Sequence, residues 1–249
     1  MNKRWRIDAP LKTGNMTPAR PVLSIVLPML NEAAGIVGCL QGLAPLRAAG
    51  VEVIVVDGGS ADHSVALATP LADQVVSAAR GRASQMNAGA AIAHGKVLLF
   101  LHADTRLPPE ADRRIDQAIA SGRQWGRFDV RIEGNSRWLP VVAAMMNWRS
   151  RLSGIATGDQ AMFVSRDSFH AVGGFPDIPL MEDIALSRRL RDRGRPACLS
   201  ARVTTSGRRW EAQGVWRTIL LMWRLRLRYF LGADPHQLAI EYGYATRKP

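Results

Sequence analysis

Between residues 21 and 101 the chain alternates short apolar runs with Ala-rich segments that also carry polar side chains. The apolar runs predict strands at residues 22–27, 51–56, 74–77 and 97–101. The intervening segments predict helices at 32–48, 60–68 and 82–94. Continuous apolar strands joined by helices are typical of a parallel sheet that helices cover. The pattern therefore predicts an α/β fold with a Rossmann-like, mostly parallel sheet flanked by helices.

Beyond residue 109 the alternation is looser. It predicts helices at 110–121, 139–152 and 182–193 and strands at 128–132 and 161–164. No internal repeat or low-complexity linker interrupts this part, so we expect one domain with two halves, at residues 21–105 and 106–210. A flexible N-terminal tail is expected at 1–20, and a basic amphipathic helix and tail at 211–249.

The charge balance changes the range of partners to consider. Lys and Arg number 33 against 21 Asp and Glu, which gives a net charge of +12. Such an excess suits nucleic acid, an anionic membrane surface or a phosphorylated ligand. Residues 188–228 contain twelve arginines against Asp192 and Glu211, a local excess of +10. The excess is therefore expected to form a basic surface in the last third of the chain.

The segment at residues 214–232 alternates arginines with Trp, Leu, Tyr and Phe. As a helix it either packs on the core with its arginines reaching out to water, which we favour, or lies on anionic lipid. The two cysteines have no CxxC spacing, no apolar signal segment is found, and no apolar stretch reaches 18 residues. We therefore expect a cytoplasmic protein, with peripheral attachment to the inner face of the membrane as an alternative.

Polar residues follow each predicted strand of the first half. In open parallel sheets, ligands bind beyond these carboxyl ends of the strands. The set consists of Pro28, Asn31 and Glu32 after the first strand, Asp57 after the second, Arg82 after the third, and His102 and Asp104 after the fourth. It suits a nucleotide diphosphate, with Asp57 on base or ribose hydroxyls, Arg82 near phosphate and Asp104 on a divalent cation. Taken singly, any such aspartate could instead cap a helix, as we expect of Ser60 beside it, or form a turn.

Two more groups of polar residues lie in the second half. Glu182 and Asp183 begin a predicted helix, where the helix dipole favours a negative charge, so capping alone could account for one of them. A Gly-Gly turn precedes them in the kind of rigid loop that can present a carboxylate to a ligand. Arg209 and Trp210 follow a strand in the motif SGRRW, where Arg208 and Arg209 either clamp phosphate or form a solvated basic face.

Taken in order, these motifs resemble the family 2 glycosyltransferases with a GT-A fold. The motifs are SIVLPMLNE, VIVVDGGSAD, GRASQMNAG, LLFLHADTRLP, GDQAMFV, GGFPDIPLMEDIAL and RRW, which together span about residues 23–210. The chain is most similar to a small bacterial branch whose aspartate motif reads His-Ala-Asp and which is described beside radical-SAM and selenium-related genes.

The resemblance implies a role for each matched residue. Pro28, Asn31 and Glu32 match the opening nucleotide-contact motif, and Asp57 matches the acid that holds the uracil or ribose. Asp104 matches the last aspartate of the DxD motif, a ligand of Mn²⁺ or Mg²⁺. Asp183, with Glu182 beside it, matches the catalytic base, and Arg209 with Trp210 matches the end of the QxxRW motif. The expected donor is a nucleotide sugar, with UDP as the expected nucleotide, and the expected acceptor is a hydroxyl compound of unspecified class.

Two positions depart from the family pattern. His102 replaces the first DxD aspartate, and it could ligate the metal as a neutral imidazole, hold a ribose hydroxyl, or only pack at the strand end. Ser206 replaces the glutamine of QxxRW, which weakens the analogy with processive synthases and favours a single transfer for each acceptor.

The predicted function is therefore metal-dependent, inverting transfer of a sugar from a nucleotide-diphosphate donor to a hydroxyl. A Rossmann methyltransferase or dehydrogenase would need a Gly-rich loop after the first strand, and PMLNE is not one. The alternative is a non-enzymatic, basic nucleotide- or nucleic-acid-binding protein. We expect no nucleic-acid partner, because the clustered carboxylates would repel phosphate in the absence of a cation.

Overall fold

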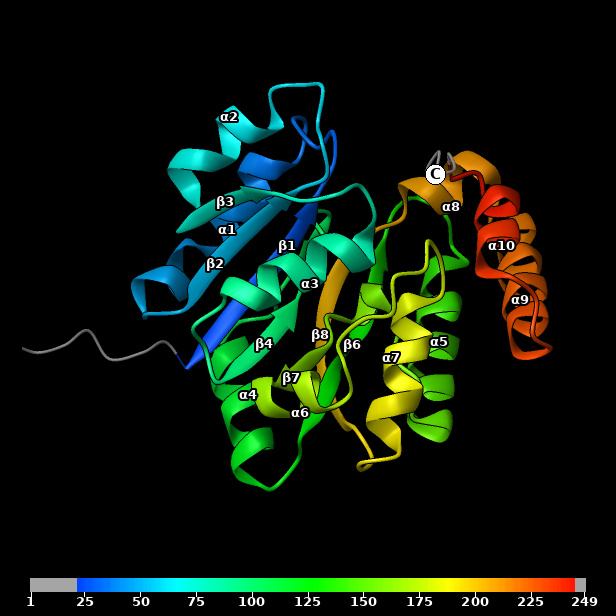
Figure 1. The fold of residues 1–249 in the computed structure, drawn as a ribbon. Coiled ribbons are helices and arrows are strands. Elements are labelled where there is room, and N and C mark those ends of the chain that lie inside the picture. The colour runs from blue at the N-terminus through cyan, green and yellow to red at the C-terminus, as the bar shows by residue number, and fades with distance from the viewer. Residues whose placement is uncertain (1–21, 245–249) are drawn as a thin grey trace, which may run out of the picture.

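The computed structural model describes residues 22–244 and contains one sheet with the strand order β3-β2-β1-β4-β7-β6-β8-β5 (Figure 1). Its strands are β1 (Leu23–Met29), β2 (Glu52–Asp57), β3 (Gln74–Ser77), β4 (Val97–Phe100), β5 (Thr105–Arg106), β6 (Trp125–Glu133), β7 (Phe163–Ser165) and β8 (Ala197–Ser206). The first four strands in this order are all parallel. β7 is antiparallel to both of its neighbours, β6 and β8 are parallel, and β5 closes the edge antiparallel to β8. The predicted mostly parallel α/β fold is thus confirmed.

The ten α-helices of the described residues follow the predicted segments with a few shifts. They are α1 (Ile36–Ala48), α2 (Ser64–Ala68), α3 (Arg82–Ile92), α4 (Ala111–Ala120), α5 (Leu139–Ser153), α6 (Arg166–Ala171), α7 (Glu182–Arg191), α8 (Arg208–Gln213), α9 (Val215–Phe230) and α10 (Pro235–Tyr242). The predicted starts of α1 at residue 32 and of α2 at residue 60 are wrong. Glu32 begins a turn, and the Ser60 hydroxyl is bound to Asp57 and accepts from the Asn31 N–H, so Ser60 caps no helix.

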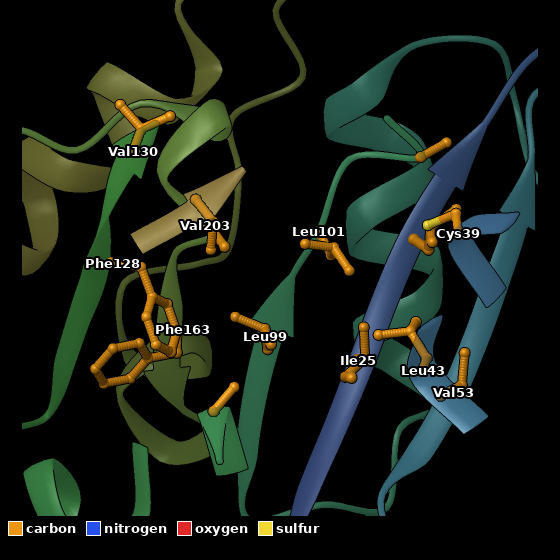
Figure 2. Packing of buried hydrophobic residues seen from close by; sticks show 14 of the residues in the cluster. Ile25, Cys39, Leu43, Val53, Leu99, Leu101, Phe128, Val130, Phe163 and Val203 are labelled. Carbon is orange, nitrogen blue, oxygen red and sulfur yellow. The ribbon is translucent and has the colours of Figure 1, made fainter. Parts of the chain in front are cut away.

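Two apolar layers cover the two faces of the sheet because successive side chains of a strand point to opposite sides. On one face Ile25 and Leu27 of β1 pack with α1, α4 and α5, and Figure 2 shows part of this layer. On the other face Val26 packs with α3, α6 and α7. The sequence of β8, ACLSARVTTS, contains no continuous apolar run. This agrees with its position, because most of its residues are only half-buried. It pairs with β6 through a register shift between Phe128 and Asp129.

The last helices form a third, smaller cluster at one end of the domain. α9 and α10 lie side by side next to α5 and α7, as the orange and red ribbons of Figure 1 show. Leu225 of α9 and Leu238 of α10 are fully buried against Leu180, Met181 and Ile184 around the start of α7. The packing expected for residues 214–232 is thus confirmed for one face of α9.

The domain boundaries that we predict from the sequence stay predictions. The proposed boundary at residue 210 falls inside α8, and the proposed tail at 1–20 lies outside the described residues. Within residues 22–244, none of the helices combines the length and the apolar character that crossing a bilayer requires.

Candidate active site

A cavity of about 1030 Å³ opens where the carboxyl ends of the parallel strands meet α5, α9 and α10. Seven of the predicted site residues line it: Pro28, Glu32, Arg82, His102, Asp104, Arg209 and Trp210. The other four, Asn31, Asp57, Glu182 and Asp183, are not among its lining residues. Motifs spread over more than 180 residues of sequence therefore meet around one cavity.

Asn31 and Asp57 join the first two strand-end loops. The Asn31 Oδ1 accepts from the Ala61 N–H at 2.8 Å, and the Glu32 N–H donates to Ser64 Oγ at 2.7 Å. The Asp57 carboxylate is 4% exposed and accepts from the N–H groups of Gly59 and Ser60 and from the Ser60 hydroxyl. These carboxylate bonds hold its own turn, so Asp57 stabilises the loop beside the cavity. Its contact with a base or ribose stays a prediction.

Acidic side chains gather at the end of β4. Asp104 is exposed to the cavity, and Glu32 faces the same space. Burial, and then the charge of Asp104, raises the pKa of Glu32 above its ordinary value. Two carboxylates that repel each other in this way form a site that a cation would stabilise.

His102 is paired with an aspartate that the sequence analysis did not select. Its Nδ1 lies 3.5 Å from Oδ1 of Asp159, which also lines the cavity. Burial alone would lower the pKa of His102, but the contact with Asp159 outweighs it and raises this pKa above the ordinary value. A ring that holds its proton more tightly is a weaker metal ligand, because only neutral imidazole coordinates a metal ion.

A short turn, Gly158–Gln160, connects His102 with Asp183. The Gly158 N–H donates to Asp183 Oδ2 at 2.8 Å, while the Ile184 N–H donates to Oδ1 at 2.7 Å. On the other side, a Cβ built on Gly158 would lie only 2.5 Å from the His102 ring. Any larger residue at position 158 would therefore force the His102 ring to move.

The two arginines predicted to bind phosphate already have protein partners. Arg82 Nε lies 2.8 Å from Oε1 of Glu182, whose side chain is 3% exposed. The Arg209 guanidinium lies over the Tyr242 ring, 3.6 Å from its centroid, and Arg209 Nη2 donates to the Tyr242 carbonyl at 3.0 Å. The Arg82 guanidinium faces the Tyr244 ring at 5.6 Å. The C-terminal segment thus covers both arginines with aromatic rings.

Backbone strain marks three of the motifs. Asn31, Ala161 and Met181 have φ values of +54°, +45° and +70°, which residues other than glycine rarely adopt. Asn31 precedes Glu32, Ala161 follows the Gly158–Gln160 turn, and Met181 precedes Glu182. Strained residues gather at functional sites when the surrounding structure holds them in place. These three positions adjoin residues of the candidate site, although neither they nor Glu110, the fourth such residue among those described, line the cavity.

The sequence analysis missed three charged residues of the cavity wall, Asp159, Arg149 and Arg226. Asp159 lies inside the quoted motif GDQAMFV, so its carboxylate could have been selected. By contrast, Arg149 lies on α5, whose sequence is mostly apolar, and Arg226 lies on α9, where it is one of several arginines. Neither sequence singles out these two residues. They enter the cavity wall because of how α5 and α9 pack.

The donor set at Asp104 fits one kind of metal site. No group of three His, Cys, Asp or Glu side chains in the described part of the chain could hold a metal ion by itself. Mg²⁺ usually keeps several waters and binds through one or two carboxylates together with substrate phosphates. The exposed Asp104, with Asp159 and His102 nearby, matches this second arrangement, in which a bound diphosphate completes the site.

Solved structures identify the class of fold. TarS from S. aureus (residues 1–349), crystallised with UDP, superimposes with a TM-score of 0.60 and 18% identity over 74% of this chain and 60% of that one. Glucosyl-3-phosphoglycerate synthase from Mycobacterium tuberculosis, crystallised with Mn²⁺, UDP and glucosyl-3-phosphoglycerate, gives 0.56 and 24% over 75% and 71%. The architecture is the GT-A fold.

Sequence comparison then gives the family. Residues 24–173 match the model of glycosyl transferase family 2, and the chain belongs to this family. A PGL/p-HBAD biosynthesis glycosyltransferase of Mycobacterium tuberculosis is 35% identical over 96 residues, which cover 36% of this chain. The match spans only 38% of the length of that relative.

Proposed function

We propose that this chain transfers a sugar from a nucleotide-diphosphate donor, with UDP as the nucleotide, to an acceptor hydroxyl in a single, inverting step. One observation carries the proposal. Asp104, Arg82 and Arg209, which come from three separate motifs, line the same cavity at the carboxyl ends of the parallel strands. The family and the UDP-bound neighbours of the same fold support a nucleotide-sugar donor. Membership of the branch with a His-Ala-Asp motif belongs to the same proposal.

The reaction follows from the charges around the cavity. The acceptor oxygen attacks the anomeric carbon, and the bond from this carbon to the diphosphate oxygen breaks with its electron pair on the diphosphate. Arg82 and Arg209 stabilise the charge that develops there. A divalent cation held by Asp104, with His102 as a second candidate ligand, would supply further charge neutralisation when bound. Attack on the face opposite the diphosphate inverts the configuration.

Asp183 is the proposed base that accepts the proton of the acceptor hydroxyl. Each of its carboxylate oxygens accepts one backbone hydrogen bond, and each keeps a lone pair for the proton. Glu182 is proposed to position Arg82 through their ion pair. Asn31, Asp57 and Trp210 are proposed to shape the nucleotide pocket, together with Pro28 and Glu32.

Calorimetry with UDP, with and without Mn²⁺, tests this proposal. The wild-type chain should bind UDP more tightly with Mn²⁺, and Asp104→Asn should lose this gain. Asp116→Asn, an exposed change on α4, is the matched control and should behave as wild type. Equal affinity of the wild-type chain with Mn²⁺ and with EDTA would contradict the metal role. Absence of UDP binding together with salt-sensitive retention of DNA would favour the non-enzymatic alternative.

We also propose that α9 contacts an anionic membrane surface. Trp216, Leu220, Trp223, Leu227 and Phe230 are all more than half exposed and recur every three or four residues. This spacing places them along one side of the helix, and the neighbouring Arg217 supplies positive charge. Flotation with phosphatidylglycerol vesicles should carry the protein upward. Failure to float with such vesicles at low salt would exclude this contact.

A further inference from the structure

The cavity has two walls of different chemistry. The wall at the strand ends carries the acidic and basic groups described above. The wall that α5 and α9 supply is mostly apolar; its apolar residues are Val142, Met145, Met146, Trp148, Ile219, Met222 and Trp223. Met145, Trp148 and Trp223 are also about half exposed or more, so the apolar wall continues to the protein surface. A nucleotide sugar has no hydrocarbon chain that would cover a wall of this extent.

Two guanidinium groups lie in the same cavity wall, one on each of these helices. Arg149 follows Trp148 on α5, and Arg226 lies one turn beyond Met222 on α9. Buried nitrogens of both side chains, Nε and Nη2 of Arg149 and Nε of Arg226, have no hydrogen-bond partner. Within residues 22–244, neither arginine has an ion pair with a carboxylate.

The pKa values of Arg149 and Arg226 reflect the absence of a paired carboxylate among the described residues. Burial, and then the charge of Arg226, lowers the pKa of Arg149 to about 10. Burial also lowers the pKa of Arg226, although Asp183 and Asp159 partly oppose this effect. Buried charged groups without partners are costly, and an anion bound between them would remove much of that cost. Nε of Arg82 and Nε of Arg209 also lack a hydrogen-bond partner. These two arginines nevertheless differ, because Arg82 has an ion pair with Glu182 and Arg209 donates to the Tyr242 carbonyl.

We infer that the acceptor is an anionic amphiphile, whose hydrocarbon tail lies along the apolar wall between α5 and α9 and whose anionic group binds Arg149 and Arg226. This inference rests on the proposed glycosyl transfer and names the class of its acceptor. The tail contacts Trp148 and Trp223 and leaves the cavity at the exposed ends of these side chains. The anion holds the head group next to Asp159 and Asp183, where its hydroxyl meets the donor sugar.

Decyl phosphate, used below its micelle concentration, tests the inference without any need for turnover. We expect calorimetry to give measurable binding of decyl phosphate, with weaker binding of decanol and of inorganic phosphate alone. Arg226→Gln and Arg149→Gln should each weaken decyl phosphate binding about tenfold or more and leave decanol binding unchanged, because each removes a charge-assisted bond. Trp148→Ser should weaken decyl phosphate and decanol alike and leave inorganic phosphate unchanged.

Matched controls separate this site from general surface effects. Arg224→Gln changes an arginine of the same helix that does not line the cavity, and Leu152→Ser changes an exposed residue one turn beyond Trp148. Both should bind decyl phosphate as the wild type does, and thermal melting verifies that each variant folds.

The possible outcomes distinguish this inference from the function on which it rests. If UDP binds but decyl phosphate does not, the acceptor class is wrong and the glycosyl transfer stands. If Arg226→Gln weakens UDP as strongly as decyl phosphate, the arginines belong to the donor site and the inference is overturned. If UDP fails to bind, the proposed function itself fails, whatever decyl phosphate does.

Discussion

Two carboxylates in each half of the domain show how different the surroundings of this group can be. In the first half Asp57 accepts hydrogen bonds from the backbone and hydroxyl groups of its own turn, and Asp62 accepts from Ser64 in the same way. In the second half Glu182 lies against Arg82, and Asp129 lies between Arg127 and Arg151. Asp57 and Asp62 therefore shape loops, whereas Glu182 and Asp129 balance the charge of neighbouring arginines. Partners and burial decide the role, and the motif alone does not.

Replacement of the proposed base should give the largest effect. Asp183→Asn removes the proton acceptor but keeps the size of the side chain, so we expect the rate of transfer to fall about 10²–10⁴-fold. UDP binding should stay near the wild-type value, because Asp183 is proposed to contact the acceptor and not the nucleotide. Single-turnover assays with a panel of UDP-sugars and hydroxyl acceptors measure the rate.

Asp192→Asn, at the other end of α7, is the control and should turn over normally. Undiminished transfer by Asp183→Asn, with loss of transfer in Asp159→Asn, would assign the base to the carboxylate that lines the cavity. Either result would place the catalytic base in the second half of the domain, because Asp159 and Asp183 both lie there.

Removal of a buried charge partner should give the next largest effect, on stability. Arg127 is fully buried, and it also donates to the Ser150 hydroxyl and the Asn147 carbonyl of α5, so the pair with Asp129 joins β6 to the helix that forms the cavity wall. Asp129→Asn should lower the free energy of unfolding by about 3–5 kcal/mol, because it leaves this guanidinium without a balancing charge. Urea titration measures the loss. A change as small as that of Asp116→Asn, at an exposed position of α4, would show that the buried pair contributes little.

A smaller effect is expected where the two halves touch at Gly158. Gly158→Ala should lower stability by about 1–3 kcal/mol, because the new methyl group would overlap the His102 ring and push it from its place. The His102 ring signals in a ¹H–¹⁵N NMR spectrum should shift in the variant. Gly42→Ala, inside α1 with no atom within 4 Å of the new Cβ, should instead stabilise the protein slightly. Equal effects of the two changes would remove the close contact as an explanation.

The smallest effect concerns Glu52 at the start of β2. Burial would raise its pKa, but hydrogen bonds from His94 and Ser24 outweigh burial and lower this pKa below its ordinary value of 4.5. A lowered folded-state pKa stabilises the protein above pH 4.5, and this contribution disappears as the pH falls through the folded value. Glu52→Gln should thus cost about 1 kcal/mol at pH 7 and almost nothing in acid. Urea titrations of both proteins across this pH range measure the difference, and a constant gap would contradict the assignment.

Much of the first half could be predicted because its signals are local. A run such as VLLF is buried on both faces of a parallel sheet, so its composition alone indicates a strand. The chain order of parallel strands then places Glu32, Arg82 and Asp104 at one edge, and in the structure these three residues line one cavity. Helix starts were less accurate, because Ser60 and Glu32 bind neighbouring loops that the sequence pattern does not reveal.

The sequence by itself determined the α/β class, the strand ends and the family motifs, since each depends on residues close together in the chain. Only the tertiary structure decided which charges are left without partners. Arg226 resembles the other arginines of its helix in sequence, yet it lies in the cavity wall while Arg224 pairs with Glu241. The difference arises from the packing of α9 against α7 and α10, which fixes the rotation of the helix. Such packing depends on contacts between segments far apart in the chain, and a local pattern carries no record of them.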